Sequence, residues 1–221
     1  MGAVKRKERL VNKDCLNIAS VLAVLALAAC SEAPKPVASE AKPKPETKNA
    51  TEIAGPVAAK TAFWEMYKVV HNWAPDVAPL GMVSKKVPGI KNEGGKAGRW
   101  TDSFVSPGRR QVRVASYSVV AVPPDVTKGL DVGPPMAWAP ARDAMPFQTS
   151  EFGIDSDAAY ETASAKAKVW VKAHPDKEVS FTLGNNAVRF QSPVWFVLWG
   201  TNKSGYAAFV NATTGAALNA K

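Results

Sequence analysis

Two stretches of the chain share a helical spacing of apolar residues, and this repeated pattern constrains the fold more than any other feature. Apolar side chains recur at steps of three and four residues over 59–73 and again over 159–171, which places each set on one face of a helix. The dipeptide Pro-Asp follows both stretches, at residues 75–76 and 175–176. Because proline cannot continue a helix, we expect helices that end near residues 74 and 174.

Segments of strand type follow each helical stretch. In the first half we expect strands at 99–105 and 111–122, with a turn at 106–109 between them. In the second half we expect strands at 179–183, 194–199 and 206–210, with a loop at 201–205 before the last strand. The run Val194–Trp199 has no charged residue and is typical of a strand buried on both faces. Together the patterns predict an α+β fold built from a duplicated helix-strand-strand-strand (α-β-β-β) unit. A single α+β domain with two unrelated helix-then-hairpin stretches is the alternative, because proline after a helix is common.

The first 29 residues have the form of a secretory signal peptide. Five basic residues precede an apolar stretch at residues 16–29. This stretch is shorter than the roughly 20 residues that a helix needs to cross a hydrocarbon layer of about 30 Å. Residues 1–29 are therefore left out of the expected fold.

The end of that segment, Leu27-Ala28-Ala29-Cys30, resembles the lipobox of bacterial lipoproteins. The resemblance implies cleavage before Cys30 and acyl chains such as palmitate on the sulfur and the new amino group of Cys30. It also implies a lipid anchor in the bacterial cell envelope, and Ser31 after the cysteine indicates the outer membrane, facing the periplasm. An ordinary signal peptide with a chance cysteine is the alternative.

Residues 30–58 differ in composition from the rest of the chain. Ala, Pro, Lys and Glu dominate this segment, and it contains no aromatic residue. Alternating Lys-Pro favours an extended polyproline II conformation, so we expect a tether that holds the folded part away from the bilayer. The folded part then consists of a first half at 59–122, a Pro-rich connection without periodicity at 123–154, and a second half at 155–221.

The C-terminal part of the second half resembles a PepSY-type module. In that family the last strand runs into an Asp-Ala-x-Thr-Gly turn, and residues 206–218 here read YAAFVNATTGAAL. Asn211 stands where the family has Asp, and both side chains can form an Asx-turn. The resemblance covers residues 155–218 and implies a small envelope module without a common active site, some members being protease propeptide inhibitors. The first half lacks the Thr-Gly signature, so a second PepSY-like copy there is a hypothesis.

Residues suited to catalysis or metal binding are scarce. The chain has two histidines and two cysteines, too few for a thiolate or histidine metal centre. His71 and His174 fall at the ends of the expected helices, where an imidazole interacts favourably with the helix dipole. A ligand or general-base role for either histidine is the alternative. We therefore expect no enzyme activity, no metal and no cofactor.

Positive charge is concentrated in one segment of the folded part. The net charge of the chain is +9, and residues 85–113 hold eight cations against Glu93 and Asp102. The candidates for binding an anionic surface are Lys85, Lys86, Lys91, Lys96, Arg99, Arg109, Arg110 and Arg113. A solvated hairpin without a partner is the alternative. We expect no nucleic-acid partner for a secreted lipoprotein.

The predicted function is that of a membrane-anchored, non-enzymatic binding module. It would contact the bilayer through lipidated Cys30 and dock an envelope protein or an anionic envelope component. Seven tryptophans form either the core or a groove for a ligand. The alternative function, by family analogy alone, is a peptidase inhibitor or maturation factor of PepSY type.

Overall fold

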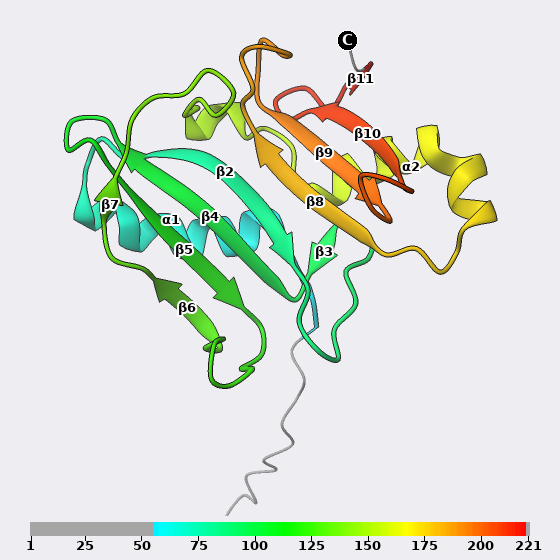
Figure 1. Ribbon diagram of the computed structural model, residues 1–221, viewed down its shortest axis with the longest axis horizontal. Coiled ribbons are helices and arrows are strands. Elements are labelled where there is room, and N and C mark those ends of the chain that lie inside the picture. The colour runs from blue at the N-terminus through cyan, green and yellow to red at the C-terminus, as the bar shows by residue number, and fades with distance from the viewer. Residues whose placement is uncertain (1–54, 220–221) are drawn as a thin grey trace, which may run out of the picture. The chain divides into compact units, whose positions relative to one another are not determined.

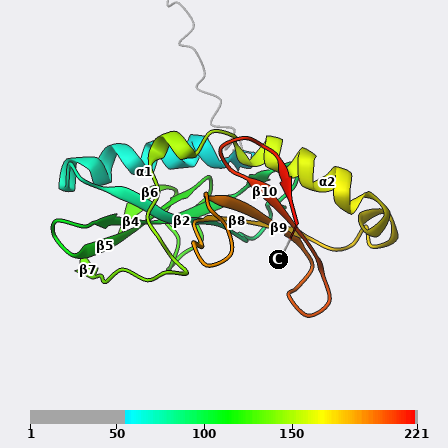
Figure 2. The same cartoon turned by 90° about the horizontal axis from the view of Figure 1, so that it is seen from above.

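In a computed structural model that describes residues 55–219, two helices cover one face of a large antiparallel sheet (Figures 1 and 2). The opposite face of the sheet carries no helix, as the view from above shows (Figure 2). The core lies between the helices and the sheet and includes the fully buried rings of Phe63, Trp100 and Trp195. Two helices on a large antiparallel sheet are compatible with the predicted α+β class, although most of the fold is sheet.

The two helices end where the Pro-Asp dipeptides predict. Helix α1 (Ala59–Trp73) has its C-cap at Ala74, and helix α2 (Ser156–Ala173) has its C-cap at His174. Both helices bury the face that the three-and-four spacing marks; the buried residues are Ala59, Ala62, Phe63, Met66 and Val70 in α1, and Ser156, Ala159, Ala163 and Ala167 in α2.

The N-termini of the two helices share one pair of capping side chains. The N-cap of α1 is Ala58, which has no side chain able to accept a hydrogen bond. Ser156 Oγ accepts instead from the Ala59 N–H at 2.9 Å, and Asp155 Oδ1 accepts from the Lys60 N–H at 2.9 Å. Asp155 Oδ1 also accepts from the Ser156 N–H at 2.7 Å. Because free N–H groups at a helix start need acceptors, this pair ties the first half of the chain to the second.

Strands follow each helix in the same order. After α1 come β2 (Ala78–Lys85), β4 (Arg99–Ser106), β5 (Gln111–Ser118) and β6 (Gly129–Val132), and after α2 come β8 (Val179–Gly184), β9 (Val194–Trp199), β10 (Tyr206–Asn211) and β11 (Ala217–Leu218). The strand order across the sheet is β11-β10-β9-β8-β2-β4-β5-β6. The two halves therefore meet where β2 pairs with β8, and each continues outward in chain order (Figure 1).

Each helix packs on strands that follow it in the chain. Helix α1 contacts β4 and β5 of the first half and β6 of the connection, whereas α2 contacts β9 and β10. Three shorter elements complete the described part: β1 (Val57–Ala58) pairs with β3 (Lys96–Ala97), β7 (Met136–Ala137) pairs with β5, and a 3-10 helix spans Thr149–Glu151. A helix followed by strands that pair in chain order therefore occurs twice, but four such strands follow each helix where the sequence predicts three.

The turn between β10 and β11 has the chemistry that Asn211 predicts. Asn211 Oδ1 accepts from the N–H groups of Thr213 and Thr214, both at 2.9 Å. Gly215 then adopts a φ of +76°, which favours glycine. The Asx-turn that Asn211 was expected to form is therefore present.

Two features of the sheet differ from expectation. Strand β9 is not buried on both faces, because both helices lie on one side and leave Phe196 and Leu198 partly exposed on the other. The connection 123–154 is also more ordered than an aperiodic linker, since it contributes β6 and β7 to the edge at β5. Its later part returns to the sheet, where the Phe147 N–H donates to the Pro79 carbonyl at 3.0 Å.

The signal peptide, Cys30 and most of the tether lie outside the described residues. Within residues 55–219, no helix is both long and apolar enough to cross a membrane. The lipid anchor therefore stays a prediction from the lipobox.

Candidate binding cavity on the helix-free face

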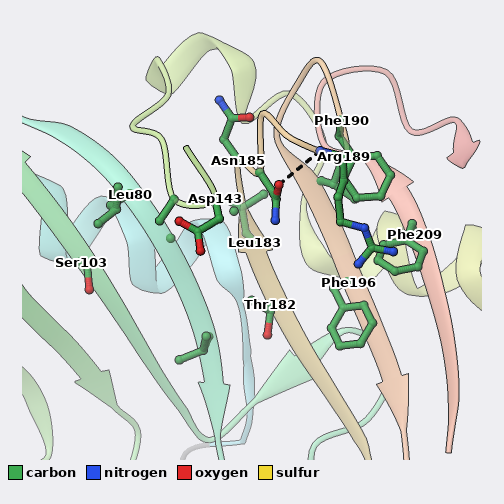
Figure 3. A pocket seen from close by; sticks show the side chains of 16 residues that line it. Leu80, Ser103, Asp143, Thr182, Leu183, Asn185, Arg189, Phe190, Phe196 and Phe209 are labelled. Atoms are coloured by element: carbon green, nitrogen blue, oxygen red, sulfur yellow. Dashed lines mark hydrogen bonds between the residues drawn. The ribbon is translucent and has the colours of Figure 1, made fainter. Parts of the chain in front are cut away.

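A cavity of about 490 Å³ opens on the helix-free face where β2 and β8 meet (Figure 3). We call it the β2–β8 cavity. Its floor includes Gly81 and Gly184, which are direct register partners across the two halves. Because neither residue has a side chain, the floor lies lower than the strands around it. A Cβ atom added to Gly184 would have no atom within 4 Å, so the space above this residue is open.

Three phenylalanines form one wall of the cavity. Phe196 of β9 and Phe209 of β10 are cross-strand partners with ring centroids 5.2 Å apart. Phe190, from the loop between β8 and β9, adds a third ring 5.3 Å from that of Phe209. Cross-strand aromatic pairs at this separation stabilise a sheet and present a continuous apolar surface.

Arg189 lies on this aromatic wall (Figure 3). Its guanidinium carbon is 5.5 Å from the ring centroid of Phe209 and 5.8 Å from that of Phe190, within the range of a cation–π contact. Among residues 55–219 the guanidinium has neither a hydrogen-bond acceptor nor an ion-pair partner. Its N–H groups are therefore available to a ligand.

The remaining polar lining comes from the two segments that border the cavity. Asp143, in the connection, lies across the cavity from Arg189 (Figure 3). Asn186 Oδ1 accepts from the N–H groups of Val188 and Arg189 at 3.1 and 3.2 Å, which holds the turn of the β8–β9 loop. Asn185 Oδ1 is buried and has no hydrogen-bond partner in the described structure.

Backbone hydrogen bonds hold the two bordering segments together. The Met145 N–H donates to the Asn185 carbonyl at 2.9 Å, and the Ala187 N–H donates to the Arg142 carbonyl at 3.2 Å. The rim of the cavity is therefore built by the connection and by a loop of the second half, although the floor is sheet. Loops on a rigid scaffold are where binding residues concentrate.

The eight cations that the sequence singles out do not gather at one place. Lys85, Lys86, Lys91, Lys96 and Arg99 lie at or near the start of β4, whereas Arg109, Arg110 and Arg113 lie beyond its other end or close to it. An eight-residue strand spans roughly 26 Å at about 3.3 Å per residue. The eight side chains therefore form two separate groups, and none of them lines the β2–β8 cavity.

Several of these cations already have intramolecular contacts. Lys86 forms an ion pair with Glu178, and Arg99 donates to Ser116 Oγ at 3.3 Å. The guanidinium carbons of Arg109 and Arg113 lie 5.7 and 5.6 Å from the ring centroid of Trp73. Binding of an anionic surface by either group stays a prediction, and a single basic face made of all eight residues is not present.

Both histidines lie at helix C-termini, where the sequence places them. His71 is in the last turn of α1 and stacks on Tyr67 at 5.5 Å, and His174 caps α2 with its ring 4.2 Å from that of Trp170. Residues 55–219 contain no group of three or more His, Cys, Asp or Glu side chains that could hold a metal ion. Neither histidine lines the cavity.

The tryptophans serve mainly the core. Trp100, Trp195 and Trp199 are buried under the helices, and no tryptophan lines the cavity. The ligand-facing aromatic residues are phenylalanines, which sequence reasoning did not select. Only Phe196 has a signal in the sequence, the apolar run of β9, and that run predicts burial on both faces instead of a cavity wall.

One carboxyl group is buried in the core under the cavity floor. Asp102 lies on β4 between Trp100 and Phe104 on the helix-covered face, and its neighbour Ser103 lines the cavity on the other face. Neither carboxyl oxygen of Asp102 makes a hydrogen bond of acceptable geometry. Burial raises the pKa of Asp102 to about 8, and the nearby N–H groups of Ser103 and Gly81 only partly oppose this shift.

The chain has little similarity to proteins of known family. No protein-family model matches it, and no curated protein matches it. One similar solved structure, from Clostridium difficile 630, is provisionally described as a lipoprotein. It has a TM-score of 0.44 and 11% identity, over 78% of this chain and 97% of that one. A likeness at this level defines neither a family nor a function.

Proposed function

We propose that the chain is a non-enzymatic binding protein of the bacterial cell envelope, whose ligand docks in the β2–β8 cavity. The observation that carries this proposal is the cavity itself: an apolar wall of three phenylalanines with unpartnered polar groups at its rim. Small-ligand sites commonly combine an apolar lining with a few polar groups, in volumes of about 300–1,000 Å³. The cavity of about 490 Å³ falls in this range.

The chemistry of the lining favours binding over catalysis. The cavity is lined by no histidine, cysteine or lysine, and Asp143 is its one acidic residue. A nucleophile with an adjacent base, or a pair of carboxyl groups, would be needed for the common hydrolytic mechanisms. The side chains present can accept, donate and pack, which is what ligand recognition requires.

The PepSY-like resemblance and the lipobox supply the setting for this function. We propose that the two helix-and-strand halves are PepSY-like modules, supported by their shared element order and by the Asx-turn at Asn211. We propose also that Cys30 anchors the chain in the bilayer, most simply at the outer membrane facing the periplasm. The tether would then hold the cavity in the periplasm.

Filling the cavity tests the binding function. Gly184→Leu should place a side chain in open space and abolish capture of the ligand, while the melting temperature stays within a few degrees of the wild type. Ser180→Leu is the matched control, because it lies on the same strand and face but does not line the cavity. The measurement is affinity capture from solubilised envelopes with both variants and wild type, followed by mass spectrometry.

The capture experiment has outcomes that contradict the proposal. Recovery of the same components with Gly184→Leu as with wild type would show that the cavity is not the docking site. A protease lost from the Gly184→Leu capture but kept with Ser180→Leu would favour the peptidase-inhibitor function instead of simple docking.

Replacing the predicted lipidation site tests the anchor. Cys30→Ser should abolish incorporation of labelled palmitate and move the protein from the membrane fraction to the soluble fraction, because acyl chains supply the membrane affinity. Cys15→Ser is the matched control and should keep both the label and the membrane location. Membrane retention of the Cys30→Ser protein would contradict the lipoprotein proposal.

A further inference from the structure

Three arginines gather at the end of the sheet where α1 finishes and the chain turns from β4 into β5 (Figure 1). We call Arg109, Arg110 and Arg113 the arginine group. Arg109 and Arg113 both pack on the ring of Trp73, and the Arg113 Nε–H donates to the Gly133 carbonyl at 2.9 Å. Within residues 55–219, no carboxylate forms an ion pair with any of the three guanidiniums. Ion pairs in this part of the chain therefore do not neutralise their charge.

Hydrogen bonds fix the hairpin turn that carries Arg109 and Arg110. Asp76, which lies just after α1, accepts from Ser106 Oγ at 2.6 Å and from the Gly108 N–H at 2.8 Å. The Ser106 hydrogen bond, followed by that of Gly108, holds the pKa of Asp76 below its ordinary value. The Asp76 carboxylate is thus charged and engaged with the turn, so the arginines extend from a rigid support.

The backbone of Arg110 has a conformation that is unfavourable for an arginine. Its φ is +53°, and no other non-glycine residue within 55–219 has a positive φ. Glycine adopts this left-handed conformation more readily than any residue with a side chain. The Trp138 N–H donates to the Arg110 carbonyl at 2.9 Å, which helps to hold the residue in place. Backbone strain of this kind is concentrated at functional sites, and here it adds a third cation to the group.

The shape of this end fits an extended partner better than a small ligand. Arg109 and Arg110 are exposed at the tip of the β4–β5 hairpin, at one end of the sheet in both views (Figures 1 and 2). None of the three arginines lines the β2–β8 cavity. A projecting turn can bring all three guanidiniums to an extended anionic surface at the same time.

The neighbouring apolar side chains indicate a lipid surface. Trp73 is only half-buried, and Val69, one helical turn before it on α1, is 41% exposed. Tryptophan is enriched where proteins meet lipid headgroups, and exposed apolar side chains can enter the boundary between headgroups and acyl chains. Guanidiniums bind phosphate oxygens through paired hydrogen bonds, and a bilayer presents phosphates over its whole surface. Arginines beside Trp73 and Val69 therefore match an anionic bilayer.

We propose that the arginine group docks the folded part of the chain on an anionic bilayer. The three guanidiniums contact lipid phosphates, and Trp73 lies at the level of the headgroups. This contact would be a second attachment beside the proposed lipid anchor, and it does not depend on the β2–β8 cavity. An anchored chain would meet the bilayer at a high effective concentration, so a weak contact is sufficient to orient it.

Vesicle binding without acyl chains tests the inference. The protein is the mature chain that the lipobox predicts, residues 30–221 with Cys30→Ser, and it contains every described residue. The probes are vesicles of phosphatidylcholine, alone or with about one quarter of anionic phosphatidylglycerol. The protein should sediment with the anionic vesicles only. Binding should weaken as salt shortens the Debye length from about 10 Å at 0.1 M to about 3 Å at 1 M.

Two variants with the same loss of charge locate the contact. The test variant combines Arg109→Gln, Arg110→Gln and Arg113→Gln, and the control combines Lys85→Gln, Lys91→Gln and Lys96→Gln. The test variant should bind anionic vesicles more weakly by roughly tenfold or more, because each cation near the surface adds to the affinity. The control changes exposed lysines near the other end of β4, roughly 26 Å away, and should lose less than about threefold.

Arg110→Gly separates the backbone strain from the contact. Glycine accepts the positive φ of this position, so the melting temperature should not fall below that of the wild type. Binding to anionic vesicles should nevertheless weaken, by roughly fivefold for one lost cation. The variant keeps its fold under this expectation, so weaker binding cannot be a result of unfolding.

Three results would overturn the inference. They are equal binding to the two kinds of vesicle, equal losses in the two triple variants, and unchanged binding by Arg110→Gly. Displacement of the protein from anionic vesicles by polyglutamate at a matched charge concentration would assign the arginine group to an acidic protein instead. If the mature chain binds no vesicles but Cys30→Ser still abolishes palmitate labelling in cells, the surface contact is wrong and the lipid anchor stands.

Discussion

The free energy of unfolding should fall by about 1.4 kcal/mol for each pH unit between pH 5 and pH 7, because of Asp102. The pKa of this carboxyl is raised to about 8 in the folded protein by burial, against an ordinary value of 3.8. Between these values the folded state keeps the proton and the unfolded state has lost it. The stability associated with protonated Asp102 is thus complete below about pH 4 and is lost as pH rises through about 8.

Replacing the carboxyl by an amide isolates this effect. Asp102→Asn should flatten the pH dependence and leave the protein more stable than the wild type at pH 8, because no buried group then has to ionise. Asp131→Asn, at an exposed position of β6, is the control and should keep the wild-type slope. The measurement is urea unfolding at pH 5, 6, 7 and 8. All three proteins contain the same two histidines, so any pH dependence that these cause cancels in the comparison. Equal slopes in wild type and Asp102→Asn would show that Asp102 is not the buried acid responsible.

The position of Asp102 could have been inferred from the sequence, but the local composition concealed it. Thr101 and Ser103 flank it, so the segment appears polar. Alternation along a strand places Asp102 on the same face as Trp100 and Phe104, two positions away on either side, and both of these are fully buried. Two aromatic residues at this spacing are a stronger indication of burial than the neighbours in sequence.

The helices were predictable because their signals are local. The apolar spacing and the Pro-Asp dipeptides act within a few residues, and the ends of α1 and α2 follow from them. The capping of α1 by Asp155 and Ser156 was not predictable in this way, since the donors and acceptors are nearly one hundred residues apart in sequence. Only the packing of the two halves brings them together.

The cavity was not predictable from the sequence because every part of it depends on long-range pairing. Gly81 and Gly184 have no special meaning until β2 and β8 pair. Arg189 comes from a loop of the second half, whereas Asp143 comes from the connection. The run of β9 gave the correct strand but the wrong environment, because periodicity does not tell on which faces of a sheet helices pack. The clustered cations show the converse: residues close in sequence are separated when the chain between them is an extended strand.

Trp195→Ala should lower the free energy of unfolding by about 3–5 kcal/mol, the usual range for removing a large buried aromatic side chain. Trp195 is fully buried, with ring centroids 5.7 Å from Phe152 and 6.3 Å from Trp100, and its Nε1–H donates to the Ile154 carbonyl at 3.3 Å. Removing the side chain leaves both a void and an unpaired carbonyl. Trp195→Phe keeps most of the side-chain volume, so it should lower the free energy of unfolding by less. If the alanine variant does not fold, the phenylalanine variant still shows whether position 195 is part of the core.

The other tryptophans provide a graded comparison for the same denaturation experiment. Trp170 is only half-buried at the end of α2, where it stacks on His174, and Trp64 is 45% exposed on α1. Because the cost of truncation rises with the area buried, the loss should decrease in the order Trp195→Ala, Trp170→Ala, Trp64→Ala. The helical spacing places Trp170 on the same stripe as the buried alanines of α2, but its partial exposure predicts a loss smaller than that for a core tryptophan. A loss for Trp170→Ala as large as that for Trp195→Ala would mean that the end of α2 is packed more tightly than the structure shows.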